Sequence, residues 1–567
     1  MNLPEPLDPE PVRPLHEAQN WHRNAVFYEV LLGSYADSNA DGIGDFQGLR
    51  SRLGYLAWLG IDCLWIPPFY PSPQLDGGYD ISDYTGIDPK YGTLEDFQAL
   101  IEDAHALGIR IVIDMVMNHT SSEHPWFQAS REEPDGFYGD YYVWRDEPDA
   151  YQDARIIFVD TEHSNWTYDE VRGQYYWHRF FSHQPDLNFE NPHVRESMRE
   201  VVRYWCSLGV DGIRLDAIPY LFEEDGTNCE NLPETHEFIC DLRQMFDEEF
   251  PGVIMIAEAN QPPEEVVDYF GTDANPECHI CFHFPIMPRL FAAMQEETSK
   301  GVKQILAQLP PLPSGGQWGT FLRNHDELTL EMVTDRERRA MYGWYAPQDR
   351  MRANVGIRRR LASLLGSSRR RIELAHALLL ALPGSPFLYY GDEIAMGDNI
   401  WLHDRDGVRT PMQWDASEGA GFSEADPKTF RLPLIDTPAW DYRAVNVEEA
   451  WGRPTSLLNW LRRTLAIRKS YPVFGVGQMT LVHTSDDAIL AFTRRDESDT
   501  VLCVYNLAGT PHAVNLWLPG MAGWRTVDMY AGNPFPTVDA NDELTLTLGR
   551  HTFYWLRMKQ PEKGDDE

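Results

Sequence analysis

Three carboxylates in this sequence are placed where they could act together on one bond. Asp216, Glu258 and Asp326 each follow an apolar run of the kind that forms a buried strand. Carboxylates this far apart along the chain meet only in a fold that gathers the ends of its strands, and a barrel of parallel strands does so. Two such groups on either side of a glycosidic bond are the minimum that glycosyl transfer requires. The three residues therefore predict chemistry on a sugar.

The neighbours of two of these carboxylates indicate different roles. Asp216 lies two residues after Arg214, so both side chains leave the same face of a strand. A nearby guanidinium favours the ionised carboxylate that a nucleophile needs. Glu258 follows four apolar residues, and an apolar setting keeps a proton available for a leaving oxygen. Each motif alone could be a structural ion pair or a buried acid, but three carboxylates at three strand ends favour a catalytic site.

The elements that must position these residues can be read from eight apolar runs, five of which end in a polar residue. Near-continuous hydrophobicity is typical of parallel strands buried on both faces. The runs are 25–32, 62–67, 109–119, 210–216, 253–258, 279–285, 317–326 and 386–393. Amphipathic helices are expected between them, for example over 93–108 after a Thr93 cap and from an Asn191 cap onward. Eight such alternations predict an α/β fold, the (β/α)8 TIM barrel.

Two insertions and a C-terminal region extend the predicted barrel. The first insertion, after the third strand, is long enough for a small subdomain at the barrel mouth, and the second, after the seventh strand, contains an aromatic stretch at 341–345 that favours a lid. Alternating segments at 488–493 and 501–505 predict a C-terminal β-sandwich, and a disordered tail is expected from Lys559. The predicted domains are the catalytic barrel, 1–119 and 189–474 with the lid insertion 327–370, the inserted subdomain B, 120–188, and the β-sandwich, 475–567.

Composition argues against several classes of partner. The net charge is −40, from 48 basic and 88 acidic side chains, so we expect neither nucleic acid nor an anionic membrane surface as a partner. Seven cysteines, an odd number spread thinly, do not suggest a disulfide framework. The N-terminus has no basic region or apolar core of a secretion signal, and no apolar stretch approaches the ~18 residues of a membrane span. A protein of the reducing cytoplasm is therefore expected.

Further motifs stand in a definite order along the chain. They are Asp114-Met-Val-Met-Asn-His119, Gln184-Pro-Asp-Leu-Asn188, Gly212-Ile-Arg-Leu-Asp-Ala217, Glu258 and Asn324-His-Asp326. In this order they resemble the sequence regions of glycoside hydrolase family 13, the α-amylase family, over roughly residues 20–560. The resemblance implies Asp216 as nucleophile, Glu258 as general acid/base and Asp326 as transition-state stabiliser. It also implies that the sugar is bound by Asp76, Tyr79, His119, Gln184, Arg214, His325 and Arg409.

Within that family the sequence resembles most the members that interconvert maltose and trehalose by intramolecular glucosyl transfer with retention, with minor hydrolysis to glucose. The resemblance rests on segments 212–221, 321–330, 354–361, 404–409 and 442–448. A small disaccharide is the implied substrate. Hydrolases of the same fold, α-glucosidase or oligo-1,6-glucosidase, and sucrose isomerase remain alternatives. Non-catalytic relatives in amino-acid transporters have a membrane span and degraded catalytic positions, which argues against that class here. A homo-oligomer is left open.

One acidic loop suggests a metal. Asp37-Ser-Asn-Ala-Asp-Gly-Ile-Gly-Asp45 has oxygens at alternate positions, but position 12 of the loop is Gly48 and not the glutamate of an EF-hand. The loop resembles the calcium loop of the same branch of the family, which implies a structural Ca2+. The implied ligands are Asp37, Asn39, Asp41, Asp45 and the carbonyl of Ile43. No organic cofactor is implied.

Two other clusters have simpler interpretations. Cys278 and Cys281 would point to opposite faces of a strand, so they cannot easily share a zinc ion, and buried thiols are expected. The arginine triplets 358–360 and 369–371 are basic islands in an acidic protein. Intramolecular salt bridges or a subunit interface are expected there, in preference to a polyanion site.

Overall fold

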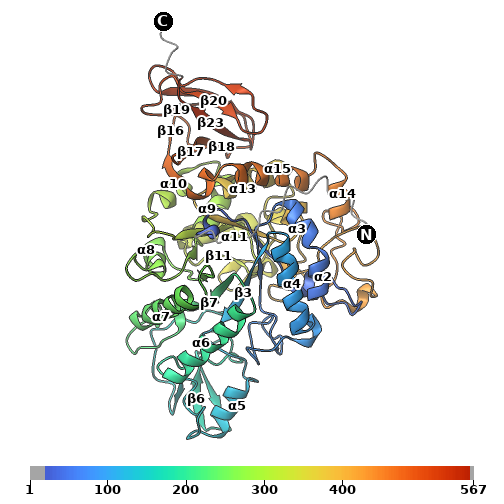
Figure 1. Ribbon diagram of the computed structural model, residues 1–567, viewed down its shortest axis with the longest axis vertical. Coiled ribbons are helices and arrows are strands. Elements are labelled where there is room, and N and C mark those ends of the chain that lie inside the picture. Colours follow the sequence, from blue (N-terminus) through green and yellow to red (C-terminus); the bar gives the residue numbers. More distant parts are fainter. Residues whose placement is uncertain (1–19, 562–567) are drawn as a thin grey trace.

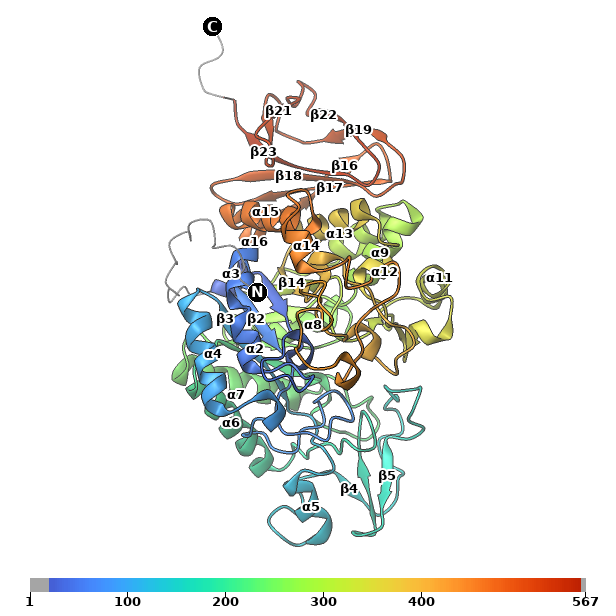
Figure 2. The same ribbon diagram turned by 90° about the vertical axis from the view of Figure 1, so that its right-hand side faces the viewer.

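The computed structural model describes residues 20–561, and a closed barrel of eight parallel strands lies at its centre (Figures 1 and 2). In barrel order the strands are β1 (Phe27–Glu29), β14 (Ser385–Tyr389), β10 (Gln317–Phe321), β9 (Ile280–Phe282), β8 (Ile254–Ala257), β7 (Gly212–Asp216), β3 (Arg110–Val116) and β2 (Cys63–Ile66). Each overlaps one of the eight predicted runs, so the barrel prediction is confirmed. Apart from Arg110, every residue of these strands is buried, because one face fills the barrel and the other meets the helices.

The helices around the barrel begin at the predicted caps. Thr93 caps α4 (Leu94–Ala106), and Asn191 caps α6 (Pro192–Ser207). The apolar stripe of α4 faces the barrel as predicted except at Leu107, which follows the last helical residue and is 39% exposed. The other helices outside the insertions are α1 (Leu32–Tyr35), α2 (Phe46–Ser51), α3 (Leu53–Leu59), α7 (Pro233–Glu249), α8 (Pro263–Val266), α9 (Ile286–Glu296), α10 (Lys300–Ala307), α13 (Arg369–Ala381), α14 (Val447–Trp451), α15 (Leu457–Ser470) and α16 (Val473–Val476). The short helix α12 (Leu361–Leu364) lies in the second insertion.

The segment between β3 and α6, the first insertion, has its own small sheet. It contains α5 (Pro125–Glu132) and three antiparallel strands in the order β4 (Trp144–Arg145), β6 (Gln174–Trp177), β5 (Trp166–Asp169). Aromatic side chains, among them Trp166 and Trp177, form a separate apolar cluster there. This sheet lies at the opposite end of the molecule from the C-terminal strands (Figure 1). The predicted limits of the domains remain predictions.

The segment after β10 is the second insertion, and its expected role as a lid remains a prediction. It holds the short sheet β11 (Leu328–Thr329), β13 (Gly356–Ile357), β12 (Arg352–Ala353) and the helix α11 (Asp335–Tyr345). Met341 and Tyr345 are one helical turn apart, so both point to the same face and are buried. The Tyr345 hydroxyl donates to the carbonyl of Phe291 in α9 at 2.8 Å. The aromatic stretch therefore packs against the barrel helices.

The C-terminal region consists of two antiparallel sheets. One has the order β15 (Gln478–Leu481), β17 (Ile489–Arg495), β18 (Thr500–Asn506), β23 (Phe553–Lys559), β20 (Arg525–Asp528), β21 (Pro534–Phe535), and the other the order β16 (His483–Thr484), β19 (His512–Trp517), β22 (Glu543–Leu548). The two predicted strands are β17 and β18. Lys559 is the last residue of β23, so the disordered tail expected from Lys559 does not begin there. Residues 562–567 lie outside the described residues. So do the N-terminal residues 1–19, which were considered for a secretion signal.

Two buried arginines attach the C-terminal sheets, and the helix α15 that precedes them, to the rest of the chain. Arg494 in β17 donates to the carbonyl of Ala381 at 2.8 Å and to that of Gly477 at 3.1 Å. Arg468 in α15 donates to the carbonyl of Leu380 at 3.1 Å and to that of Asn24 at 2.8 Å. Burial lowers the pKa of both guanidiniums to about 10. Between residues 20 and 561, no helix is long and apolar enough to cross a membrane.

Candidate active site

The three carboxylates singled out in the sequence line one cavity. Asp216 is the last residue of β7, Glu258 follows β8 directly, and Asp326 lies in the loop after β10. The cavity has a volume of about 150 Å3 and lies at the C-terminal ends of the strands. The barrel thus brings together groups that lie about 40 to 110 residues apart in the chain, as the fold of a parallel barrel requires.

A single guanidinium joins two of these carboxylates. Arg214 Nη1 lies 2.5 Å from Asp216 Oδ1 and 2.6 Å from Asp114 Oδ1, and Arg214 Nη2 lies 2.7 Å from Glu258 Oε1. The backbone N–H of Ala217 donates to the other oxygen of Glu258 at 3.2 Å. The Arg214 side chain is 1% exposed, whereas the side chains of Asp216 and Glu258, which line the cavity, are 11% and 22% exposed. The two carboxylates are therefore fixed relative to each other.

The protonation of this cluster differs from the sequence expectation. Burial raises the pKa of Asp216 well above its ordinary value, Glu258 and Asp114 add to the shift, and Arg214 opposes it. The sequence showed one cation beside Asp216 but not the other carboxylates that share it. Because one guanidinium cannot neutralise three carboxylates, the cluster takes up a proton. Such a shared proton is what an acid/base pair needs.

The third carboxylate has the opposite environment. Asp326 Oδ1 accepts hydrogen bonds from Arg405 Nη1 at 2.9 Å and Arg409 Nη2 at 3.0 Å, and Oδ2 lies 3.2 Å from His325 Nε2. Burial alone would raise the pKa of Asp326, but these three cations hold it well below its usual range. Burial would also lower the pKa of His325, yet Asp326 and Glu29 raise it to about 9. Asp326 is thus a fixed negative charge at neutral pH.

One wall of the cavity consists of residues predicted to bind a sugar. Asp76 Oδ2 accepts a hydrogen bond from Gln184 Nε2 at 2.9 Å, and Asp76 Oδ1 lies 2.5 Å from Arg405 Nη2. The Tyr79 ring stacks on His325, with 5.4 Å between ring centres, and its hydroxyl donates to Asp114 at 3.0 Å. Burial lowers the pKa of His119 to about 3, so its ring is neutral. This wall offers one carboxylate, one aromatic face and one neutral imidazole.

The predicted sugar-binding residues fall into two groups. Asp76, Tyr79 and His119 line the cavity directly. Gln184, Arg214, His325 and Arg409 lie behind it and contact the residues that do. The second group therefore orients groups that face the cavity.

The two insertions contact each other beside the cavity, which Glu331 lines. Arg155 of the first insertion pairs with Glu331 of the second at 3.0 Å, and Glu331 also accepts a hydrogen bond from Asn260 at 2.7 Å. Beneath them Glu230 contacts Arg155 and Arg179. We call this group the mouth cluster; its members are Arg155, Arg179, Glu230, Asn260, Gln261 and Glu331. It joins four segments that are separate in sequence.

Comparisons with known proteins agree with this site. Residues 29–343 and 357–477 match the family model described as alpha amylase, catalytic domain, and residues 479–555 match that of maltogenic amylase, C-terminal domain. The chain belongs to the α-amylase family. Among its relatives, the trehalose synthase/amylase TreS of Mycobacterium tuberculosis is 56% identical over 96% of this chain and 91% of that protein. A trehalose synthase of Pimelobacter sp. is 55% identical, over 97% of each chain.

A solved structure supports the same assignment. The alpha-glucosyl transfer enzyme XgtA superposes with a TM-score of 0.77 at 28% identity, over 95% of this chain and 99% of that one. As a member of the α-amylase family, the chain is expected to place its chemistry at the strand ends where the three carboxylates meet. Their individual roles remain predictions.

Sequence reasoning missed several residues that line the cavity of this α-amylase family member. The most informative is Arg405, which bridges Asp76 and Asp326 and is buried. A signal was present, because Arg405 stands between two aspartates four residues before Arg409. The other missed lining residues are Ile157, Phe158, Phe180, Ala217, Tyr220, Asn260, Phe284, Asn324, Glu327, Thr329 and Glu331. Most come from the insertions or from loops.

The first arginine triplet supports the loop that carries Arg405. Arg358 Nη1 donates to the carbonyl of Leu402 at 2.8 Å, Arg359 pairs with Asp398 at 3.0 Å, and Arg360 Nε donates to the carbonyl of Val408 at 3.1 Å. These contacts are intramolecular, as expected. They fix both ends of the segment 398–408.

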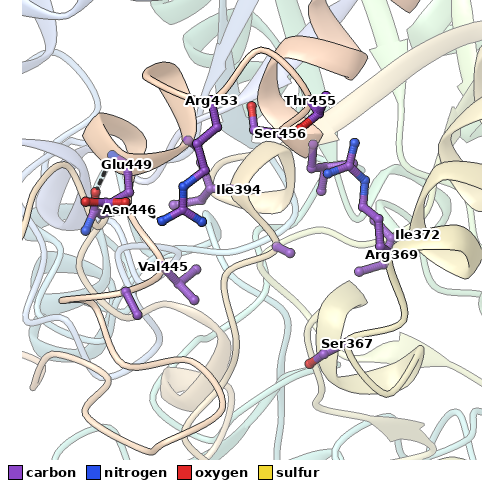
Figure 3. Close-up of a pocket in the computed structure, with 14 residues that line it drawn as sticks. Ser367, Arg369, Ile372, Ile394, Val445, Asn446, Glu449, Arg453, Thr455 and Ser456 are labelled. Atoms are coloured by element: carbon purple, nitrogen blue, oxygen red, sulfur yellow. Dashed lines mark hydrogen bonds and ion pairs between the residues drawn. The ribbon is translucent and has the colours of Figure 1, made fainter.

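A second, larger cavity, drawn in Figure 3, shares no lining residue with the first. Its volume is about 330 Å3, and it is bordered by the N-terminal ends of α13 and α15 and by α14. Arg369 pairs with Glu373 at 2.6 Å, and Arg453 pairs with Glu449. Glu449 is the one carboxylate among the residues that line it. The cavity therefore lacks the pair of carboxylates that glycosyl transfer needs.

The proposed calcium loop offers oxygen atoms but no preformed cluster of acids. Asp37 Oδ2 accepts hydrogen bonds from the N–H of Gly42 at 2.8 Å and from the Ser423 hydroxyl at 2.6 Å, and Asp41 Oδ1 accepts from the N–H of Ile43 at 2.8 Å. Asp45 caps α2. In the described part of the chain, no three acidic, histidine or cysteine side chains gather as a metal site. A calcium ion would have to use amide, carbonyl and carboxylate oxygens together, which suits a hard cation.

The two cysteines considered for zinc are buried thiols. Cys278 is 2% exposed and Cys281 is fully buried, and burial raises the pKa of both well above the ordinary value. A thiol with a raised pKa is a poor metal ligand, because the thiolate is the binding form.

Proposed function

We propose that this chain interconverts maltose and trehalose by intramolecular glucosyl transfer, with glucose as a minor product. The observation that carries the proposal is the 55 to 56% identity, over nearly the whole chain, to proteins named as trehalose synthases. The site supports it, because a pair of carboxylates lies in a small cavity that Glu331 also lines, and Glu331 forms an ion pair between the two insertions.

In the first half of the reaction, Glu258 gives its proton to the glycosidic oxygen as the bond between that oxygen and the anomeric carbon breaks. Asp216 attacks the anomeric carbon, forming a covalent glucosyl ester and releasing glucose. In the second half, Glu258 takes the proton of the anomeric hydroxyl of that glucose. Its oxygen attacks the glucosyl carbon and displaces Asp216, giving the α,α-1,1 bond. Two displacements retain the anomeric configuration.

The remaining residues bind and orient the reacting ring. Asp326, held ionised by three cations, can accept hydrogen bonds from ring hydroxyls that strengthen as positive charge develops at the anomeric carbon. Asp76 and Tyr79 can fix the non-reducing glucose, one by hydrogen bonds and one by its ring face. Arg214 keeps Asp216 and Glu258 at a fixed separation.

Transfer to glucose must compete with transfer to water from the same intermediate. Bulk water is about 55 M, whereas a group held in place reaches effective molarities of about 10⁵ to 10⁸ M. A closed mouth that keeps the released glucose beside Asp216 is therefore sufficient to favour the isomer. The Arg155–Glu331 ion pair, which links the two insertions, is the contact suited to that task.

One incubation tests this function against the alternatives. Unlabelled maltose is supplied together with isotope-labelled free glucose, and trehalose and glucose are resolved by mass. We expect trehalose as the main product with almost no label, because the glucose that re-attacks has not left the site. Glucose as the main product would make the enzyme an α-glucosidase. Free entry of label would make it an open transglucosylase. A parallel incubation with sucrose tests the last alternative, and activity on sucrose but not on maltose would make it a sucrose isomerase.

We further propose a structural Ca2+ in the loop 37–45, held by Asp37, Asn39, Asp41, Asp45 and the carbonyl of Ile43. The support is the set of oxygen donors on one short loop. Bound there, the ion would stabilise the loop after β1 through binding linkage. The finer domain assignment, subdomain B over 120–188 and a β-sandwich over 475–567, is part of the same proposal. We also propose that the protein is located in the cytoplasm, because a reducing compartment suits the free thiols of all seven cysteines.

A further inference from the structure

Glu230 lies at the centre of the mouth cluster. Its Oε1 accepts hydrogen bonds from Arg155 Nε and Arg179 Nη2, each at 2.8 Å. Its Oε2 accepts a hydrogen bond from Gln261 Nε2 at 2.8 Å. The side chain is 4% exposed. One buried carboxylate thus joins the first insertion, which carries both arginines, to the segments that follow β7 and β8.

The charges of the mouth cluster balance only while Glu230 is ionised. Two guanidiniums, Arg155 and Arg179, face two carboxylates, Glu230 and Glu331. Burial alone would raise the pKa of Glu230, but the two arginines and the hydrogen bond from Gln261 lower it below its ordinary value. Arg179 is fully buried, so the loss of its partner would leave an uncompensated charge, which is costly.

Two arginines link Glu230 to residues that line the sugar cavity. Besides its contact with Glu230, the Arg155 guanidinium donates to the Tyr220 hydroxyl at 3.2 Å and pairs with Glu331 at 3.0 Å. The Arg179 guanidinium lies 4.9 Å from the centre of the Tyr220 ring. Tyr220 and Glu331 line the cavity, whereas Glu230 lies behind them. Glu230 can therefore affect the reaction through its neighbours without touching the sugar.

We propose that Glu230 is a positioning residue that keeps the mouth closed and so sets the ratio of glucosyl transfer to hydrolysis. The inference rests on the proposed function, since it concerns the fate of the glucosyl group on Asp216. When Glu230 is neutral, Arg155 loses the contact that aims it at Glu331. The ion pair between the two insertions then weakens, and water competes with the retained glucose for the glucosyl group on Asp216.

The test compares three full-length variants with the wild type. Glu230→Gln removes the charge at nearly constant shape, and Glu230→Asp keeps the charge on a shorter side chain. Glu277→Gln is the matched control, because Glu277 is a buried carboxylate paired with His236 at 3.0 Å, ahead of β9 and so at the other end of the barrel. Two quantities are measured: the glucose-to-trehalose ratio from maltose, and amide hydrogen exchange of segments 150–160 and 327–332 in the absence of sugar.

We expect Glu230→Gln to raise the glucose-to-trehalose ratio about tenfold and to speed exchange in both segments, as loss of one partner of a buried ion pair implies. Glu230→Asp should fall between Glu230→Gln and the wild type. Glu277→Gln should lower the Tm and leave the ratio and the exchange of these segments unchanged.

An unchanged ratio and unchanged exchange in Glu230→Gln, with a fall in Tm like that of the control, would overturn the positioning role. The exchange measurement needs no substrate. A wild type that yields only glucose from maltose would therefore defeat the proposed function, while exchange still reports separately whether Glu230 closes the mouth.

Discussion

Arg405 is the side chain whose replacement tests the site most sharply. Its guanidinium bridges two carboxylates, with Nη2 2.5 Å from Asp76 Oδ1 and Nη1 2.9 Å from Asp326 Oδ1. A lysine at this position keeps the charge but is a point donor on a flexible stem, so it cannot span both partners. In Arg405→Lys, Asp326 still has its contacts with His325 and Arg409. The loss therefore falls mainly on Asp76.

The magnitude follows from the contact that is lost. A hydrogen bond to a charged group contributes about 1.5 to 3 kcal/mol. Since each 1.4 kcal/mol is a factor of ten, we expect kcat/KM of Arg405→Lys to fall about 10- to 150-fold. Arg405 also lowers the pKa of Asp76 against the effect of burial. Without the bridge that pKa rises, so the acid limb of the kcat/KM profile should move to higher pH.

The assay is the initial rate of glucose transfer from maltose at several substrate concentrations between pH 4.5 and 9, taken with a melting curve. Arg369→Lys is the matched control, because Arg369 is an ion-paired arginine that borders the second cavity and not the site. A value of kcat/KM for Arg405→Lys within threefold of the wild type, with an unmoved acid limb, would refute the reasoning. It would mean that Asp76 does not need this partner to bind the sugar.

Three further expectations follow from the same geometry. Asp216→Asn should abolish turnover, and a fluorinated glucosyl donor should label Asp216 of the wild type; a label on another residue would disprove its role as nucleophile. The pKa of His325 is raised to about 9, so its contribution to stability is complete below about 6.5 and is lost as pH rises through 9; the Tm should fall over that range and do so less in His325→Gln. Strong chelation should lower the Tm without changing the ratio of trehalose to glucose, and Asp41→Ala should remove this sensitivity; a Tm indifferent to chelator would mean that the loop 37–45 binds no calcium.

The strands of the barrel could be predicted from the sequence because their signal is local. A strand buried on both faces must be apolar along its whole length, and the runs that contain β7, β8 and β10 each end at a carboxylate. The gathering of Asp216, Glu258 and Asp326 followed from that pattern. This prediction depends on the topology of the barrel and not on contacts between side chains.

The rest could not be predicted, because it depends on pairs that are distant in sequence. Arg405 and its partner Asp76 are 329 residues apart, and no local pattern links them. The carboxylates that share Arg214 with Asp216 are likewise on other strands, so the sequence showed a single ion pair where the structure has a crowded cluster. At 341–345 the aromatic content suggested a lid, but composition does not tell which face of a helix is covered.

The hydrogen bonds of Arg494 bear on how far this protein can be treated as a set of exchangeable modules. The two family models divide the chain between residues 477 and 479, as if the C-terminal sheets were a portable unit. Yet Arg494 crosses that division to reach the carbonyls of Ala381, Gly475 and Gly477. Without the C-terminal sheets, these buried carbonyls would lose the hydrogen bonds that Arg494 donates to them. Chimeras that exchange the C-terminal sheets should thus fold only when the donor supplies an arginine at the position of Arg494, and heat should melt barrel and sheets in one transition.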